Sequence, residues 1–342
     1  MHKKILSDRL FEMDALRIIA IFAVIMVHIA TSFVFRNPYS LLDHSVGNFL
    51  MSVSKFSVPF FLMSSGYFML HEEKKLSASI LRYKISKLFL ILVFWSFLYA
   101  LYFPINNFLK TFILGYYHLW YLYAFIGLYI MTPVLRLCTK KENKNVLYYA
   151  CGICILFTSC PKLLFFLPKD LYISEFSHKF LVPVNSILMY YLLGYLIRID
   201  FDRLRKFKIS LYITLFLSLC VSILGVQFFT SSKREAEEIF YSSSSLPLIL
   251  YSVSLFILLL DFIQNNKQKY SEFLQQKISA LASLILGVYL IHAAVLRVFR
   301  STFLNLNTVC YIPVVWLVVT VLSFLITYLI SKIKYLKWLI KI

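Results

Sequence analysis

Long apolar stretches alternate with short polar loops along the whole chain. An α-helix rises about 1.5 Å per residue, so about 20 mostly apolar residues are needed to cross the hydrocarbon core of a bilayer. The pattern predicts an all-α, polytopic membrane helix bundle with about ten transmembrane helices. The apolar stretches cover roughly residues 13–35, 46–70, 86–104, 112–136, 146–167, 180–198, 209–229, 245–263, 279–297 and 308–331.

Basic residues are unevenly divided between the loops on the two sides of the predicted bundle. Most of the 35 Lys and Arg residues fall in loops that would share a side with the N-terminus. Cytoplasmic loops of membrane proteins carry an excess of Lys and Arg. We therefore expect both termini in the cytoplasm and an even number of transmembrane helices.

The composition excludes two other classes of protein. Hydrophobic residues make up 60% of the chain, charged residues 15%, and the mean hydropathy is +0.77, which leaves too little polar surface for a soluble protein of this length. The formal net charge of +19 is spread over the loops, so we expect no nucleic-acid partner but contact with membrane lipid. No linker or repeat is visible, and residues 1–342 are interpreted as one integral membrane domain.

A stripe of polar residues runs along the first apolar stretch. A helix turns about 100° per residue, so Arg17 and His28, eleven residues apart, lie on nearly the same face, and Asp14 shares it. A charged side chain at membrane depth costs about 2.5–3.5 kcal/mol, so such residues usually line a functional cavity. His28 could take a proton from a hydroxyl or accept an acyl group itself. The alternative is a histidine that only bonds to a neighbouring helix.

The second apolar stretch contains several residues that are unusual in a simple membrane span. Lys55 is a cation at or near membrane depth, and Pro59 frees a backbone carbonyl that a polar group could use. Ser65 and Gly66, followed by Tyr67, would let another helix or a ligand approach closely, and helix packing is the simpler reading of small residues.

A basic cluster precedes the third stretch, formed by Arg82, Lys84 and Lys87. Positive-inside anchoring explains such a cluster when it is taken alone. A cytosolic donor rich in phosphate would also need it, because guanidinium and ammonium groups bind phosphates well.

Two further motifs are predicted at the outer side of the membrane, at the depth of His28. His118 and Trp120 open the fourth stretch, with Tyr121 expected to be an ordinary interfacial aromatic residue. Tyr289 and His292 lie near the outer end of the ninth stretch. The chain contains no P-loop, no metal-ligand cluster and no nucleophile elbow, so any chemistry must take place within or at the membrane.

Together these motifs resemble the acyltransferase-3 family of integral membrane acyltransferases, and the similarity covers essentially the whole chain. The matching positions are Arg17 with His28, the block 56–67, the segment 118–122, Pro133 and the segment 289–292. The resemblance implies an acyl-CoA donor, most often acetyl-CoA, used from the cytoplasmic side of a bacterial inner or plasma membrane. It implies an acceptor hydroxyl on a surface glycan or its lipid-linked precursor, with no permanently bound cofactor.

The resemblance also implies roles for individual residues. His28 would be the catalytic histidine and Arg17 its functional partner, with Asp14 on the same face as a third catalytic candidate. The donor-binding candidates are Arg82, Lys84, Lys87, Lys55, Ser65 and Tyr67. The candidates for binding the acceptor are His118, Trp120, Tyr289 and His292.

Two other functions remain open from the sequence. An exporter or flippase of a polysaccharide intermediate would also carry buried charge and broken helices. Such transporters often contain two related halves, and residues 1–170 show no pairing with residues 171–342. A membrane scaffold is the other alternative, and the polar stripe in the first stretch argues against it.

Overall fold

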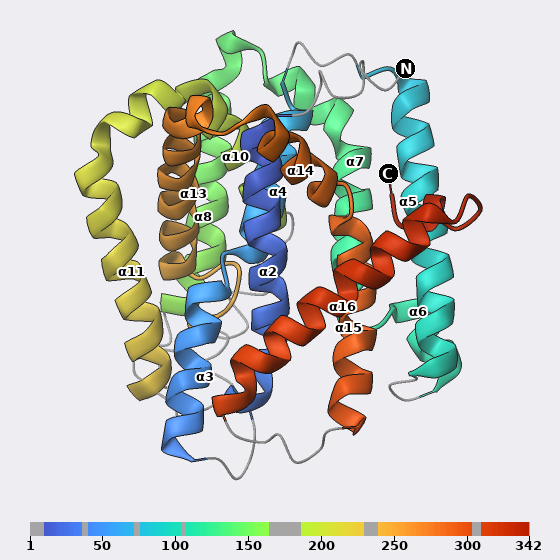
Figure 1. The fold of residues 1–342 in the computed structure, drawn as a ribbon. Coiled ribbons are helices and arrows are strands. Elements are labelled where there is room, and N and C mark those ends of the chain that lie inside the picture. The colour runs from blue at the N-terminus through green and yellow to red at the C-terminus, as the bar shows by residue number, and fades with distance from the viewer. Residues whose placement is uncertain are drawn as a thin grey trace.

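The computed structural model describes residues 10–35, 40–71, 76–103, 107–163, 186–228, 239–302 and 309–341. Within these ranges every regular element is a helix and none is a strand (Figure 1). The predicted all-α architecture is therefore confirmed.

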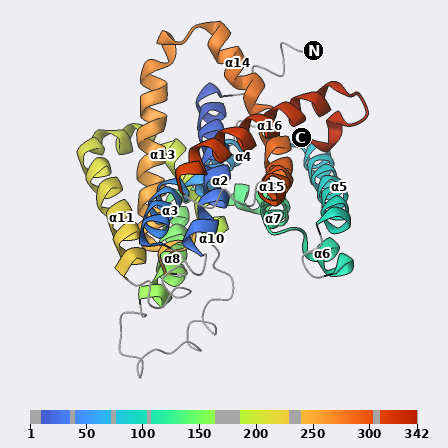
Figure 2. The same ribbon diagram turned by 60° about the horizontal axis from the view of Figure 1, so that its bottom comes forward.

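The helix α2, Phe11–Val34, stands in the middle of the bundle (Figures 1 and 2). It contacts α3, α4, α13, α14, α15 and α16. Leu16, Ala20, Ile21 and Ile25 are fully buried along its length. Because neighbouring helices surround α2, the polar groups that it carries face protein rather than hydrocarbon.

The stretch predicted at 46–70 forms two helices, α3 (Leu41–Ser54) and α4 (Ser57–Met69). Proline has no backbone N–H, so Pro59 cannot bond to the carbonyl of Lys55, and the chain is broken at Lys55 and Phe56. The break places the Lys55 cation at a point where polar backbone groups also need partners.

The helix α10, Ser186–Leu204, crosses α4 at very short range. A Cβ atom added to Gly66 would lie 1.7 Å from the carbonyl oxygen of Tyr191, and one added to Gly194 would lie 2.0 Å from that of Met63. Only glycine leaves room for this crossing. The expectation that Ser65 and Gly66 admit a close neighbour is confirmed, and at Gly66 the neighbour is α10.

The remaining helices surround this centre in two groups (Figure 1). One group contains α8, α11 and α13, and the other contains α5, α6 and α7, while α16 crosses the bundle obliquely beside α15. Their bounds are Ala78–Tyr102 (α5), Phe108–Leu114 (α6), Trp120–Cys138 (α7), Lys144–Leu163 (α8), Lys208–Phe228 (α11), Leu246–Asn266 (α13), Glu272–Ala282 (α14), Ile285–Thr302 (α15) and Ile312–Lys332 (α16). Short 3₁₀ turns connect or follow them at Lys141–Asn143 (η1), Arg205–Phe207 (η4), Lys267–Lys269 (η6), Val309–Tyr311 (η7) and Lys337–Leu339 (η8).

Each apolar stretch expected from the sequence overlaps a helix. Among the described residues, however, fewer than ten helices are long and apolar enough to cross a membrane. Among the described residues, seven helices are long and apolar enough to cross a membrane, or eight if α14 and α15, bent by 54° at their junction, form one span. The helices α10 and α11 join through η4 into one continuous segment, Ser186–Phe228. The count of ten and the cytoplasmic termini stay predictions, and residues 164–167 and 180–185 of the expected spans lie outside the described residues.

Several outer helices expose large apolar side chains instead of burying them. Ile209 and Phe216 of α11 are 78% and 64% exposed, and Leu329 of α16 is 55% exposed. A soluble protein avoids continuous apolar surface of this kind, whereas lipid accepts it. The surface therefore agrees with a multi-pass membrane protein.

Candidate active site

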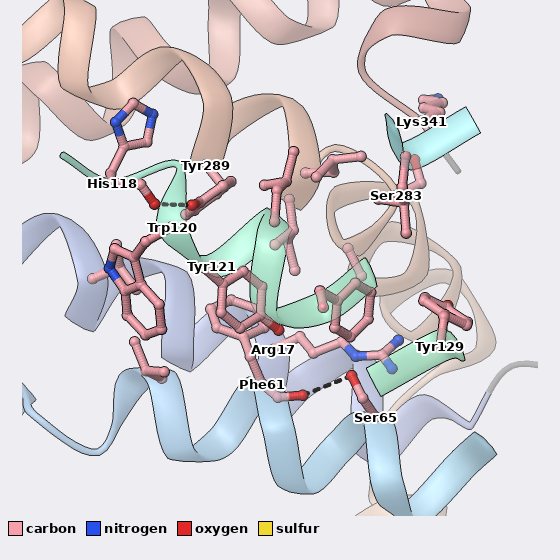
Figure 3. A pocket seen from close by; sticks show the side chains of 18 of the residues that line it. Arg17, Phe61, Ser65, His118, Trp120, Tyr121, Tyr129, Ser283, Tyr289 and Lys341 are labelled. Atoms are coloured by element: carbon pink, nitrogen blue, oxygen red, sulfur yellow. Dashed lines mark hydrogen bonds between the residues drawn. The ribbon is translucent and has the colours of Figure 1, made fainter. Parts of the chain in front are cut away.

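A cavity of about 300 Å³ lies within the bundle, against α2 (Figure 3). Its wall is formed by α2, α4, α5, α7, the junction of α14 with α15, and the residue Lys341. Six of the residues predicted from sequence line it, namely Arg17, His28, Ser65, His118, Trp120 and Tyr289. The structure thus brings together residues that are separated by most of the chain.

Arg17 and His28 line this cavity from one face of α2, with Val24 between them. The expected shared face is therefore confirmed for Arg17 and His28. The two residues mark two regions of the cavity, here called the Arg17 end and the His28 end. A ligand inside the cavity can contact a guanidinium at one end and an imidazole at the other.

The Arg17 end is cationic. The Arg17 guanidinium lies beside Ser65, Tyr121 and Tyr129 (Figure 3). Lys84 is close enough to act electrostatically on Arg17, and its Nζ lies 5.8 Å from the centre of the Tyr129 ring. Among the described residues, no Asp or Glu lines the cavity. A cation in a low-dielectric site without a carboxylate partner favours an anionic ligand.

The His28 end contains a cluster of three histidines from three elements. The His292 ring, on α15, lies 5.2 Å from the His28 ring and 5.3 Å from the His118 ring, measured between ring centres. His118 precedes α7 and is 2% exposed, and His292 is fully buried. The structure therefore brings the three predicted histidines together, and their depth on the outer side of the membrane stays a prediction.

The hydrogen bonds of His292 fix which of its nitrogens carries hydrogen. Its Nδ1 lies 2.7 Å from the backbone oxygen of Tyr289, and a carbonyl can only accept, so Nδ1 is the donor. In the neutral ring Nε2 is then an acceptor, and it has no partner among the described residues. A buried acceptor without a partner is costly unless a ligand or a neighbouring donor satisfies it.

Tyrosine hydroxyls lock the segments that carry these rings. Tyr289 donates to the backbone oxygen of His118, which links α15 to the start of α7 (Figure 3). Tyr99 donates to the backbone oxygen of Leu290 at 2.7 Å and accepts from the N–H of Ala294 at 3.2 Å. Because these bonds tie α5, α7 and α15 together, the histidine rings are held in a fixed arrangement.

Two cations lie near His28 outside the cavity wall. Lys55 and Arg300 are both within electrostatic range of the His28 ring. The Arg300 guanidinium donates to the backbone oxygen of His28 and to the Ser32 hydroxyl, each at 2.9 Å. The Nζ of Lys55 lies 5.4 Å from the centre of the Tyr241 ring. The sequence offered no reason to select Arg300, because a basic residue at the end of a membrane span is usually an ordinary loop charge.

Several residues predicted for the site do not line the cavity, and their roles stay predictions. Asp14 accepts a hydrogen bond at 2.8 Å from Ser279 and so links α2 to α14. Tyr67 lies under the Arg198 guanidinium, at 4.9 Å from the ring centre. In the expected basic cluster, Lys87 lies over the ring of its neighbour Tyr83, and Arg82 is exposed. Only Lys84 of that cluster reaches the neighbourhood of Arg17.

The cavity also contains residues that sequence reasoning missed. Tyr121 was expected at the membrane interface, yet it lines the cavity together with Tyr129 and Lys341. The aromatic spacing offered a signal, since Tyr121, Phe125 and Tyr129 follow one another at intervals of four residues and share a face of α7. Nothing in the sequence pattern placed Lys341 in the wall of this cavity.

A family profile described as an acyltransferase domain matches residues 10–332. This chain belongs to the acyltransferase-3 family. Membership confirms the resemblance drawn from the motifs and supports acyltransferase activity within a membrane domain. No curated protein and no solved structure matches the chain.

Proposed function

We propose that this protein transfers an acyl group, acetyl in the simplest case, from acyl-CoA to a hydroxyl of a cell-surface or lipid-linked glycan. One observation carries the proposal: a single cavity holds both the Arg17 guanidinium and the His28 imidazole. Family membership supports the acyl transfer itself. The protein is proposed to lie in a bacterial inner or plasma membrane, and the excess of Lys and Arg in the loops on the N-terminal side supports an orientation with the Arg17 end toward the cytoplasm.

The donor is proposed to enter from the Arg17 end. A cavity of about 300 Å³ is at the lower limit for ligand sites, so it can enclose the thin pantetheine arm and the acyl group while the nucleotide stays at the mouth. Arg17 and Lys84 supply positive charge on that side. Phosphate groups of acyl-CoA are the anions that this charge would attract.

In the direct route, His28 acts as a general base. Its free ring nitrogen takes the proton of the acceptor hydroxyl while the oxygen attacks the thioester carbonyl. The carbon–sulfur bond then breaks, the CoA thiolate leaves, and the proton passes from the imidazolium to the sulfur. The ester product and the CoA thiol balance the reaction without any other reactant.

In the covalent route, His28 is the nucleophile. Its nitrogen attacks the thioester carbonyl, the carbon–sulfur bond breaks, and a cationic acyl-imidazolium forms as the CoA thiolate leaves. The acceptor hydroxyl then attacks the acyl carbon, the carbon–nitrogen bond breaks, and the hydroxyl proton is released to the thiolate or to solvent. This route explains why a histidine distant from the Arg17 end would be needed.

The other residues of the His28 end are proposed to position the base and the acceptor. The Nε2 of His292 has no hydrogen-bond partner among the described residues, and the centre of the His28 ring lies 5.2 Å from that of His292, so a reorientation of the rings would let this Nε2 accept the ring N–H of His28. That bond would direct the free nitrogen of His28 toward the reacting groups. Trp120, Tyr289 and His118 offer aromatic surface and polar edges to a sugar.

The experiment that tests the function is acyl transfer by the purified protein. The protein in lipid nanodiscs is mixed with labelled acetyl-CoA and with glycan or lipid-linked saccharide extracted from cells that lack it. We expect labelled ester on the saccharide, with mass spectrometry of surface glycans losing the same modification when the protein is absent. Saccharide that binds to the protein and is moved across vesicles without being labelled would support the exporter or flippase instead.

A further inference from the structure

The chain returns to the cavity after its last long helix. The helix α16 ends at Lys332, the backbone turns, and residues 337–341, here called the return segment, come back to the bundle. Leu339 is 5% exposed and Ile340 is fully buried. The segment is therefore packed into the protein and is not a loose tail.

Two helices hold the return segment in place. The indole N–H of Trp95, on α5, donates to the backbone oxygen of Leu339 at 3.2 Å. On the other side, the Cβ of Ile340 lies 3.1 Å from a Cβ built on Gly287 of α15, so the absence of a side chain at Gly287 makes room for it. These contacts fix the backbone immediately before Lys341.

Lys341 is thereby brought into the wall of the cavity that contains Arg17 and His28. It lies on the side of Ser283, where α14 and α15 meet at an angle of 54° (Figure 3). The family profile ends at residue 332, so the position of Lys341 is known from the structure and not from the family.

The charges that line the cavity are all positive in the described part of the chain. Arg17 and Lys341 contribute them, and Lys84 adds a third cation close to Arg17. An ammonium group on a flexible stem is a compact point charge that binds phosphate without a fixed geometry. Arg17 and Lys341 thus line one cavity from distant parts of the sequence, with Lys84 close to Arg17, and a ligand with several phosphates requires several cations of this kind.

We propose that Lys341 is a donor-binding residue that contacts a phosphate group of acyl-CoA, and that the return segment forms part of the donor site. This inference rests on the proposed function. In this proposal Lys341 takes the phosphate-binding role that the sequence suggested for Arg82 and Lys87, from which it lies far away in the chain. The alternative is that Lys341 only anchors the end of the bundle at the membrane surface.

The test compares two donors that share the thioester and the pantetheine arm but differ in the phosphorylated nucleotide. Acetyl-CoA carries the nucleotide phosphates, whereas acetyl-pantetheine has the same thioester and arm without any phosphate. Steady-state transfer is measured for the wild type and for Lys341→Gln in nanodiscs. Because a phosphate contact acts on binding, we expect the KM for acetyl-CoA to rise about tenfold, kcat to stay within about twofold, and both constants for acetyl-pantetheine to be unchanged.

Two further variants make the result specific. Lys341→Arg keeps the charge and should recover most of the affinity for acetyl-CoA. Lys337→Gln removes the same charge from the same segment at an exposed position and should leave both donors unaffected. Equal losses with both donors in Lys341→Gln would show a structural role, and unchanged constants with acetyl-CoA would exclude the contact. A wild type that transfers from neither donor would overturn the proposed function itself.

Discussion

The rings at the His28 end of the cavity are packed closely on segments that hydrogen bonds tie together, whereas the cations in and beside the cavity are carried by long side chains on separate elements. His118 and His292 are both buried and lie on segments tied together by Tyr289. Arg17, Lys84 and Lys341 come from α2, α5 and the return segment. Bond-making needs a fixed geometry, while recognition of a phosphate tolerates flexible charges. The two ends should therefore respond differently to substitution, the first in kcat and the second in KM.

The largest effect is expected from His28→Ala. Removing the proposed base or nucleophile should lower kcat for acetyl transfer by about a hundredfold to ten-thousandfold, with little change in the KM for acetyl-CoA. The measurement is steady-state transfer by purified protein, with membrane protein level checked in parallel. His71→Ala is the matched control, because His71 lies at the end of α4 and does not line the cavity. Wild-type acetylation by His28→Ala would end the proposed mechanism.

Arg17→Gln is expected to have a smaller effect, and to act on KM more than on kcat. This change removes one charge-assisted contact at the donor end, so the KM for acetyl-CoA should rise about tenfold to a hundredfold while kcat falls less. Arg17→Lys should restore part of the affinity, since it keeps the charge but loses the planar fork of donors. If Arg17→Gln instead lowered kcat as much as His28→Ala, the division between the two ends would be wrong.

His292 tests whether the histidine cluster acts as a unit. In His292→Leu the acceptor for the His28 N–H is lost, and we expect kcat to fall about tenfold with an unchanged KM for acetyl-CoA. His292→Gln keeps a polar group at the same place and should retain more activity. The pH profile of kcat distinguishes positioning from packing, because only a partner of His28 would alter its shape. If His292→Leu and His292→Gln both kept the wild-type pH profile and changed the KM for the acceptor instead, His292 would belong to the acceptor site.

The two ends also differ in how far the sequence could predict them. Arg17 and His28 are on one helix, so the period of the α-helix alone places them on one face. His118 and His292 were found because intramembrane polar residues are rare and point to function. Local patterns carry this kind of information, and here they were sufficient for the fold class and for most of the His28 end.

The Arg17 end depends on contacts between distant segments, which no local pattern contains. Arg82 and Lys87 have the spacing of a phosphate-binding cluster, yet only Lys84 reaches the neighbourhood of Arg17, because side chains around an α-helix point in different directions. In the sequence, Lys341 looks like an ordinary loop charge. Only the turn after α16 and the space beside Gly287, which Ile340 approaches, bring it to the cavity wall. The 54° bend between α14 and α15 was likewise hidden within a stretch expected to be one helix.

The smallest effect on catalysis is expected from Gly66→Ala, next to the cavity residue Ser65. The added methyl group would meet the backbone of α10, since its Cβ would lie 1.7 Å from the Tyr191 carbonyl oxygen. Forcing the two helices apart should cost about 1–3 kcal/mol of stability and lower the Tm in nanodiscs. Gly127→Ala on α7 is the control, because no atom lies within 4 Å of its added Cβ. The protein that remains folded should keep kcat and KM close to wild type, because Gly66 supports the frame and touches neither end of the cavity. A change in KM without a change in Tm would mean that the α4–α10 crossing shapes the donor site directly.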